Sequence, residues 1–482
     1  MGDRVGITAY GAYLPVLRLS RAAVAAAHAW ALPGLDAKGH RAMAAWDEDA
    51  VTLAVEAARD ALTMAPGPVE NAILASTSFP FADRLNAGIL TTALDLEGRV
   101  RAQDAGGSQR AASTALITAL GQGLPTLVAA GEKRPTRPGG ALELASADAG
   151  AAVTVGRERV LAEVLGVASE TADFVDHYRD AEGDPDYVLE ERWTRDAAVL
   201  AFVPQTVARA LEAAGVSGGE IDIALLAFPT TALAKAAAKA LDLPGARVRD
   251  AFTGQIGQAG AAHPLLMLAE ALETGRPGQT ILLVAFGSGC DALVLRTTEA
   301  LAQVRPLRPV APQIAAGREE TRYLRFLSFT GGVSYAWGIR SERDNRTAQT
   351  TAWRKSRDIY ALVGGRCSQC GTVQFPRSRT CVNPNCRQMD TQEAYGLSNS
   401  IGRIKTFTED WQAFTPDPPL RYGNVGFAEG GNALMEIADC PPEGLNIGQE
   451  VRFAFRVKDY DDRRGFRRYF WKAVPVSKEE PA

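Results

Sequence analysis

Two patterns of apolar residues alternate along residues 5–298. Short runs of aliphatic and β-branched residues predict buried strands at 72–75, 127–129, 223–226 and 281–284. Between them, apolar positions recur every three or four residues, the period of an amphipathic helix, at 49–63, 111–121, 198–214, 232–241 and 265–274. This alternation predicts an α/β fold.

One stretch of the chain is echoed later. Gly106-Gly107-Ser108-Gln109-Arg110 opens a helix that leads to a strand ending in Gly131, and Gly257-Gln258-Ala259-Gly260 opens a helix that leads to a strand ending in Gly287. The echo favours a duplicated βαβ unit, although coincidence in an Ala-rich sequence would produce it too. Helices with such small side chains fit between two sheets, where close approach is needed.

The amino-acid composition changes beyond residue 300. Residues 300–354 are rich in Pro, Arg and aromatics with little periodicity, which predicts a connecting segment. Short β-type runs at 402–407, 432–437 and 450–457 then favour a small barrel. We therefore expect three regions: 1–345, with halves at about 1–165 and 195–300 plus the connecting segment; 346–395, a zinc ribbon with a leading helix; and 396–482, the barrel.

Four of the six cysteines fall within residues 367–386, as two close pairs. Such pairs place four thiolates around one tetrahedral Zn²⁺, and four protein ligands close its coordination shell. The sequence therefore predicts a structural zinc without a catalytic water, although free or disulfide-bonded cysteines are the alternative. The predicted ligands are Cys367, Cys370, Cys381 and Cys386.

Overall composition narrows the class of protein. The chain has 482 residues and a formal net charge of −4, so its bulk charge gives no reason to expect a nucleic-acid partner. The first residues lack the pattern of a signal peptide, and we find no uncharged run long enough for a bilayer. Clustered cysteines favour metal binding in a reducing compartment. We therefore expect a cytoplasmic protein that is not in a membrane.

Several motifs resemble one superfamily. The segment 5–15 (VGITAYGAYLP), the segment 47–58 (DEDAVTLAVEAA) and Phe286-Gly287-Ser288-Gly289 are similar, in this order, to hydroxymethylglutaryl-CoA synthases and ketoacyl synthases III of the thiolase superfamily. The portion from Arg357 onward resembles the zinc-ribbon/OB-fold proteins that accompany thiolases. The resemblance implies a five-layer αβαβα domain followed by a rubredoxin-like zinc ribbon and an OB-fold β-barrel. It also implies a homodimer and coenzyme A thioesters as substrates, and it leaves open an additional thiolase-type subunit as a partner.

The catalytic residues of that superfamily are not carried over. Gln109 occupies the position of the nucleophilic cysteine, Ala227-Phe228-Pro229 that of the histidine, and Gln258 that of the asparagine. The glutamate base of hydroxymethylglutaryl-CoA synthases falls near Ser78. An acyl-cysteine mechanism is therefore not expected.

An enolate or oxyanion could still be stabilised. The helix start at Ser108 offers backbone N–H groups, the Gly287-Ser288-Gly289 turn offers another beside the acyl group, and the Gln109 amide can donate a hydrogen bond. Our first hypothesis is C–C bond making or breaking on a β-oxo- or β-hydroxyacyl-CoA, by a retro-Claisen, aldol or decarboxylative route.

That route needs an acid or base. His263, at the second buried helix start, is the first candidate, with a pKa expected near working pH. His177 or Tyr178, in a polar-aromatic loop, is the second, and Asp104 the third; packing and capping roles are the alternatives. Cys290 is better explained as a small apolar strand residue.

Two other functions stay open. A non-catalytic scaffold that binds acyl-CoA would also lack the catalytic cysteine, histidine and asparagine. Alternatively, Ser108 could act as the nucleophile of an acyltransferase, which requires a base within hydrogen-bond reach.

Overall fold

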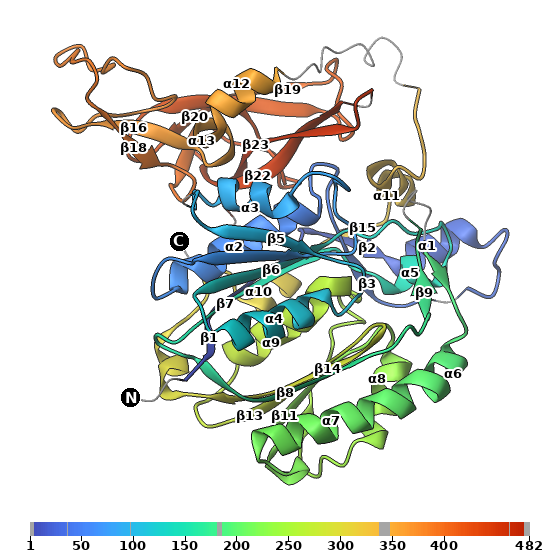
Figure 1. The fold of residues 1–482 in the computed structure, drawn as a ribbon. Helices are drawn as coiled ribbons and strands as arrows, with labels where there is room; N and C mark the ends of the chain where they lie inside the picture. Colours follow the sequence, from blue (N-terminus) through green and yellow to red (C-terminus); the bar gives the residue numbers. More distant parts are fainter. Residues whose placement is uncertain are drawn as a thin grey trace. The chain divides into compact units, whose positions relative to one another are not determined.

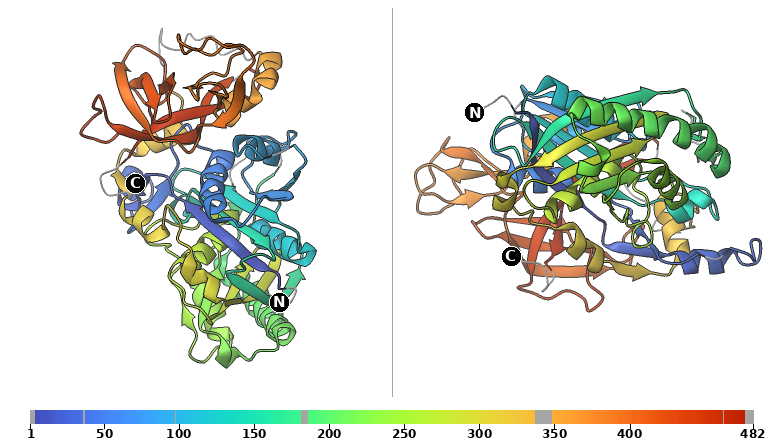
Figure 2. Two further views of the ribbon diagram at one scale, coloured as in Figure 1. Left: turned by 90° about the vertical axis from the view of Figure 1, so that its left-hand side faces the viewer. Right: turned by 90° about the horizontal axis from the view of Figure 1, so that it is seen from below.

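The computed structural model describes residues 4–35, 37–96, 98–180, 186–336, 348–461 and 463–476. These residues form two compact units (Figures 1 and 2). The first comprises residues 1–45, 49–88 and 98–333, and the second comprises 46–48, 89–97 and 334–482. The boundary predicted at 345–346 lies outside the described residues.

A ten-stranded sheet in the first unit consists of two copies of one five-stranded pattern. The order in the first copy is β1-β7-β6-β4-β5, and in the second it is β8-β14-β13-β11-β12. In each copy the first two pairs are antiparallel and the last two are parallel. The echo therefore reflects a structural repeat. The strands are β1 (Gly6–Tyr13), β4 (Asn71–Ala75), β5 (Arg101–Ala105), β6 (Thr126–Glu132), β7 (Ala149–Gly156), β8 (Ala162–Thr171), β11 (Ile223–Ala227), β12 (Arg247–Val248), β13 (Thr280–Phe286) and β14 (Gly289–Thr297).

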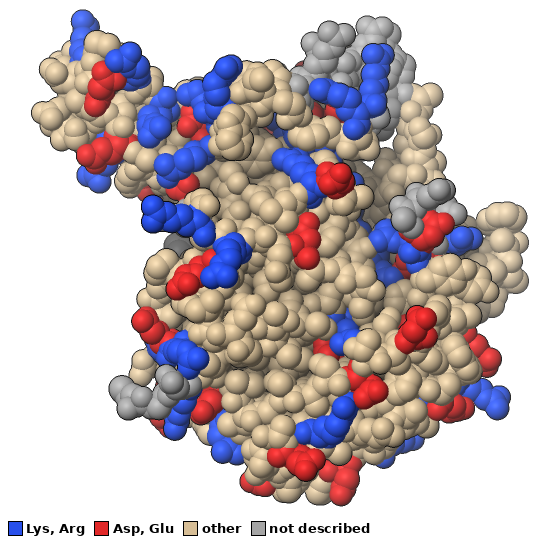
Figure 3. All heavy atoms as spheres, in the orientation of Figure 1, with Lys and Arg blue, Asp and Glu red and all other residues tan. Residues whose placement is uncertain are grey.

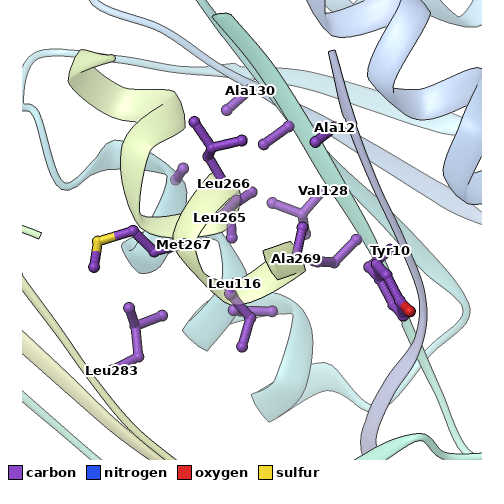
Figure 4. Close-up of a cluster of buried hydrophobic side chains, with 14 of the residues drawn as sticks. Tyr10, Ala12, Leu116, Val128, Ala130, Leu265, Leu266, Met267, Ala269 and Leu283 are labelled. Carbon is purple, nitrogen blue, oxygen red and sulfur yellow. The ribbon is translucent and has the colours of Figure 1, made fainter. Parts of the chain in front are cut away.

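Helices complete five layers. Between the two half-sheets lie α4 (Ala111–Gln122) and α9 (His263–Glu273), which pack against each other and against strands of both copies (Figure 1). Helix α2 (Ala50–Met64) covers the first half-sheet, and α7 (Leu200–Ala214) and α8 (Thr231–Ala240) cover the second. The predicted αβαβα arrangement is confirmed. Figure 4 shows Leu116 of α4 and Leu265 of α9 in the shared core.

Close approach explains the small residues. A Cβ at Gly131 of β6 would lie 1.9 Å from the carbonyl oxygen of Ala50, so only glycine lets α2 pack directly on this strand. Asp49 caps α2 by accepting hydrogen bonds from the N–H groups of Val51 and Thr52, at 3.1 and 3.0 Å. The segment 47–58 thus encodes both the start and the buried face of the helix.

Smaller elements surround this core. Among its described residues, the connecting segment 300–354 includes helices at 310–315, 323–330 and 349–354 and a strand at 318–320, and these elements are too short to give a periodic signal. The additional elements of the first unit are β2 (Leu17–Ser20), β3 (His40–Met43), β9 (His177–Tyr178), β10 (Tyr187–Val188), β15 (Arg318–Glu320), α1 (Arg21–His28), α3 (Asn86–Ala93), α5 (Ala141–Ala145), α6 (Glu191–Thr194), α10 (Val310–Ala315), α11 (Tyr323–Thr330), a π-helical turn η1 (Arg195–Val199), and the short helices η2 (Gly218–Glu220), η3 (Gly260–Ala262) and η4 (Glu299–Gln303); α3 continues into residues of the second unit.

One helical stretch of the described residues, Glu191–Ala214, is long and apolar enough to cross a membrane by length and composition. Its α7 portion buries Val203, Val207 and Ala210 and packs against β8 and β14. The core helix of a soluble protein has this character too.

The second unit holds two sheets. Strands β16 (Val363–Cys367), β17 (Val373–Gln374) and β18 (Gln392–Gly396) form the ribbon, in the order β17-β16-β18. The other sheet has the order β21-β20-β19-β22-β23, and a parallel bridge between Ile437 and Ala473 brings its two edges together. This is the order of a partly open five-stranded Greek-key barrel of the OB type. The remaining elements are α12 (Gln349–Arg354), α13 (Ser356–Tyr360), β19 (Gly402–Asp410), β20 (Leu420–Phe427), β21 (Asn432–Glu436), β22 (Glu450–Asp461) and β23 (Phe466–Pro475).

Candidate active site

The start of α4 meets the glycine turn that follows β13. Ser108 donates a hydrogen bond from Oγ to the carbonyl oxygen of Gly287, at 2.8 Å. A Cβ at Gly287 would lie 2.8 Å from Ser108 Oγ and 3.3 Å from the backbone nitrogen of Gln109, so glycine is what permits this contact. Ser288 has a φ of +48°, which tightens the turn. The structure therefore brings together Ser108, Gln109 and the Gly287-Ser288-Gly289 turn.

A buried ion pair holds this junction. Arg110 lies 2.7 Å from Asp291 of β14, and its Nε donates to the Gly287 carbonyl at 2.8 Å. Asp291 is fully buried, and it also accepts hydrogen bonds of 2.7 Å from the hydroxyls of Ser113, Thr114 and Ser169. The pair therefore fixes α4 of the first copy to strands of the second. Sequence reasoning missed it, although an acid inside the apolar run 290–295 was a signal.

His177 contacts Gln109, which lies just before the start of α4. Its Nε2 is 3.3 Å from Nε2 of Gln109, and its Nδ1 is 2.9 Å from Oδ2 of Asp176. Both contacts are satisfied by the neutral tautomer in which Nδ1–H donates to the carboxylate and Nε2 accepts from the amide. This Asp-His arrangement orients the ring and leaves a basic nitrogen facing Gln109. Asp176 was not singled out from the sequence, although it directly precedes His177.

The hairpin that carries His177 is anchored to the first copy. Strand β9 pairs with β10, so that His177 lies opposite Val188. Arg179 donates to the carbonyl oxygen of Thr77, and the buried Asp186 forms an ion pair with Arg134. These contacts hold the histidine over α4. Tyr178, the other residue of this loop expected to act on substrate, is 54% exposed and packs at a tilt against Tyr187, with ring centroids 5.6 Å apart.

The structural repeat has an equivalent junction, where the segment just before α9 meets the end of β6. A second buried carboxylate, Glu132, holds this junction together. It ends β6, is fully buried, and accepts hydrogen bonds from the backbone N–H groups of Thr77 and Ala261, at 3.1 and 3.0 Å, and from the hydroxyl of Ser78. It therefore joins the start of the second buried helix to the first copy, as Gly287 joins α4 to the second. With these donors around it, Glu132 is suited to a structural role. No sequence motif singled it out.

His263 is enclosed. Its side chain has no exposed surface, and its Nδ1 accepts a hydrogen bond of 3.2 Å from the backbone N–H of Ala259. Burial lowers the pKa of His263 from 6.5 to about 4. The expectation of a pKa near working pH is therefore wrong, because desolvation of the charged form dominates at this position. A catalytic role for His263 stays a prediction.

Two other predicted residues use their polar atoms locally. Gln258 accepts a hydrogen bond from the N–H of Gly260 at 2.8 Å. Asp104 accepts from the N–H groups of Asn86 and Ala87, at 2.9 and 2.7 Å, and so caps α3, as its alternative role predicted. Neither contacts the group around Gln109 through a hydrogen bond among the described residues.

Two possible nucleophiles lack activation. Ser108 donates its proton to a carbonyl oxygen rather than to a base. Burial raises the pKa of the Cys290 thiol to about 12, which suits the packing role expected from the sequence.

The four ribbon cysteines converge. Their Sγ atoms all lie within 4.8 Å of one another, and the Cys367–Cys386 and Cys370–Cys381 pairs are 3.8 and 3.6 Å apart. Tetrahedral zinc with bonds of about 2.3 Å needs sulfurs about 3.8 Å apart, so the geometry fits this ion. The hydroxyl of Thr391 lies 3.2 Å from Cys367 Sγ and supports that ligand. The predicted zinc site is therefore confirmed as a four-cysteine centre.

Surface charge agrees with the composition. On the face drawn in Figure 3, basic and acidic side chains lie interspersed. The β22–β23 hairpin carries a basic run at residues 463–471, in which Arg464 pairs with Asp461 and Arg468 with Asp459. These ion pairs suit a solvated hairpin rather than a binding site for a polyanion.

Family comparisons match both parts of the chain. Residues 211–297 match the C-terminal domain of 3-oxoacyl-[acyl-carrier-protein] synthase III, and residues 354–390 match the rubredoxin-like zinc ribbon domain of ChsH2. The hydroxymethylglutaryl-CoA synthase of Pyrobaculum aerophilum is 30% identical over 322 residues, which cover 62% of this chain and 90% of that protein. The enzyme of the same name from Archaeoglobus fulgidus is 31% identical over 317 residues, with 62% and 90% covered.

Solved structures share the fold. A hydroxymethylglutaryl-CoA synthase complexed with CoA aligns with a TM-score of 0.59 and 16% identity, covering 71% of this chain and 95% of that one. The 3-oxoacyl-[acyl-carrier-protein] synthase III of Pseudomonas aeruginosa aligns with a TM-score of 0.55 and 22% identity, covering 61% and 99%. Both alignments support the thiolase-like architecture of the first unit.

Proposed function

Because this chain belongs to the hydroxymethylglutaryl-CoA synthase family of thiolase-like proteins, we propose that it is an acyl-CoA enzyme that makes or breaks a C–C bond of aldol type on a β-hydroxyacyl-CoA. The contact of His177 with both Asp176 and Gln109 carries this proposal. It supplies an oriented base and an amide donor without an acyl-enzyme nucleophile.

Cleavage in this site needs only a proton shuttle and a hydrogen-bond donor. In the complex the β-hydroxyl replaces the Gln109 amide as the donor to Nε2 of His177. Nε2 then removes the hydroxyl proton, and the Cα–Cβ bond breaks to give a carbonyl compound and the enolate of the shortened acyl-CoA. The enolate then takes a proton at Cα from the imidazolium, which restores neutral His177. Asp176 stabilises the imidazolium between the two steps.

We expect Gln109 to act on the developing negative charge. Once substrate takes its place at His177, the amide N–H group can donate to the thioester oxygen. A glutamine cannot form an acyl-enzyme, which a retro-Claisen route through the family's cysteine would use. The aldol route therefore suits this site better than the retro-Claisen route.

The zinc has a separate role. Four thiolates complete its shell, so it would stabilise the ribbon and leave the chemistry to the first unit. We also expect an edge-to-edge homodimer, since β5 has no strand on its outer side in the described part of the sheet.

The test is product analysis with purified protein. Incubation with β-hydroxyacyl-CoA and β-oxoacyl-CoA thioesters, followed by mass spectrometry, distinguishes the routes. Aldol cleavage yields a carbonyl compound and a shortened acyl-CoA without consuming free CoA, whereas retro-Claisen cleavage consumes it. Binding of the thioesters without turnover of any of them would overturn the proposal in favour of a scaffold.

A further inference from the structure

A pocket of 580 Å³ opens on the zinc ribbon, within the second unit. It is remote in sequence from every residue of the candidate active site, and neither the zinc nor the proposed chemistry uses it. Its lining residues are Lys355, Arg377, Ser378, Arg379, Asp390 and Gln392.

Two of the lining residues, Arg377 and Gln392, lie against Gly365 of β16. A Cβ at Gly365 would lie 2.6 Å from Oε1 of Gln392 and 2.9 Å from Cγ of Arg377. Only glycine therefore leaves room for these two side chains to lie together over the strand. The neighbouring Arg366 stacks on Tyr395 instead, with its guanidinium carbon 5.8 Å from the ring centroid.

The lining carries positive charge. It has three basic side chains and one acidic one, a formal sum of +2. Arg379 is held by Asp390 through two hydrogen bonds of 2.7 Å, and Lys355 lies 3.1 Å from Asp358. Among the described residues, Arg377 makes no hydrogen bond or ion pair, so its five donors remain for a ligand.

A buried amide points to the same conclusion. Both polar atoms of the Gln392 side chain are buried without a hydrogen-bond partner. Such groups are rare, because losing hydration without a replacement costs about 1–3 kcal/mol. The Gln392 side chain lies beside that of Arg377, and both line the pocket, so a single ligand with acceptor oxygens would bond both the amide N–H group and the guanidinium.

We propose that this pocket binds a phosphate monoester. A guanidinium, an ammonium and an amide N–H need more acceptor oxygens than a carboxylate offers, and a phosphoryl group supplies three. The volume exceeds that of a phosphate ion, which leaves room for the esterified group. Two sources share this chemistry: free phosphate, and the terminal phosphate of a nucleotide such as the 3′-phosphate of coenzyme A.

The experiment is calorimetric titration of the full-length, zinc-loaded protein. The probes are inorganic phosphate, adenosine 3′,5′-bisphosphate, CoA and dephospho-CoA, which lacks only the 3′-phosphate. Arg377→Met removes the free donors, and Gly365→Ala places a methyl group against Arg377 and Gln392, which must then shift. The matched control is Arg366→Met, since Arg366 is adjacent in sequence but stacks on Tyr395.

We expect Arg377→Met and Gly365→Ala to weaken phosphate-ester binding by about tenfold or more at unchanged zinc content, and Arg366→Met to leave it unaltered. If Arg377→Met also abolishes the preference for CoA over dephospho-CoA, the coenzyme is the source; if it affects inorganic phosphate alone, free phosphate is. Equal affinities in wild type and Arg377→Met, or no phosphate binding by the wild type, would overturn the proposal. Because the difference between wild type and Arg377→Met isolates binding at the ribbon, this result does not depend on binding or turnover in the first unit.

Discussion

The imidazole Nε2 of His177 lies 3.3 Å from the side-chain nitrogen of Gln109, although 68 positions separate the two residues in the sequence. The contact joins a hairpin of the second copy to the buried helix start of the first. It places a basic nitrogen beside the residue that the family resemblance aligns with the nucleophilic cysteine. The proposed chemistry depends on this relationship.

Replacing His177 should abolish most turnover. We expect His177→Gln to lower kcat by about 10²- to 10⁴-fold, because general acid–base catalysis typically contributes that much. Initial rates with the cleaved β-hydroxyacyl-CoA would measure it. The control is His40→Gln, since His40 is partly exposed and pairs with Glu319. Full activity of His177→Gln would refute the assignment.

Breaking the Arg110–Asp291 pair should destabilise the fold. Asp291→Ala leaves Arg110 buried without its carboxylate and three hydroxyls without their acceptor, so we expect a loss of about 3–5 kcal/mol in the free energy of unfolding. The exposed pair Arg209–Glu170 is the control, and Glu170→Ala should cost about 0–1 kcal/mol. Urea unfolding compares the two. Similar losses in both variants would contradict a special role for the buried pair.

The layers of the fold were predictable because their chemistry is local. The small side chains of α4 and α9 indicated helices between two sheets, and the spacing of the four cysteines indicated a metal centre. Both signals are contained in short stretches of sequence, and the structure confirms both.

The site was less predictable because its contacts are distant in sequence. Glu132 bonds Ala261 across 129 positions, and Arg110 pairs with Asp291 across 181. No spacing rule links such residues. His263 illustrates a further limit: its place at a helix start was visible, but the loss of solvent that controls its pKa depends on the packed interior.

Gly260 should tolerate no side chain. A Cβ there would lie 2.6 Å from Cγ of the buried Glu132, and its φ is +49°, so we expect Gly260→Ala to lower the free energy of unfolding by about 2 kcal/mol or more. The same change at Gly121, an exposed position of α4 with nothing within 4 Å of the added carbon, should stabilise by about 0.5–1 kcal/mol. Thermal or urea unfolding would show the opposite signs. Equal effects at both positions would exclude the close approach to Glu132.

Removing zinc should unfold the ribbon selectively. We expect about one zinc per chain by elemental analysis, and its loss in Cys381→Ser, because a missing thiolate opens the shell. The control is Cys440→Ser, since Cys440 lies outside the cluster. Limited proteolysis after chelation should cut within residues 363–396 first. Retention of a full equivalent of zinc by Cys381→Ser would contradict four-cysteine coordination.

His263 should make the protein less stable in acid. Its pKa is 6.5 in the unfolded chain and about 4 in the folded protein, so below pH 6.5 the unfolded state binds a proton that the folded state excludes. Stability is therefore unaffected by His263 above about pH 7 and falls by about 1.4 kcal/mol per pH unit below 6.5, a loss of about 3 kcal/mol by pH 4. The measurement is the difference in unfolding free energy between wild type and His263→Gln across this range, which removes contributions from other groups. The difference should stay constant above pH 7 and shift by about 3 kcal/mol toward the variant by pH 4. Parallel curves, or a histidine resonance of the folded wild type that titrates near pH 6.5 and disappears in the variant, would show that His263 is accessible to solvent and protons. It would then again be a candidate for the acid–base group.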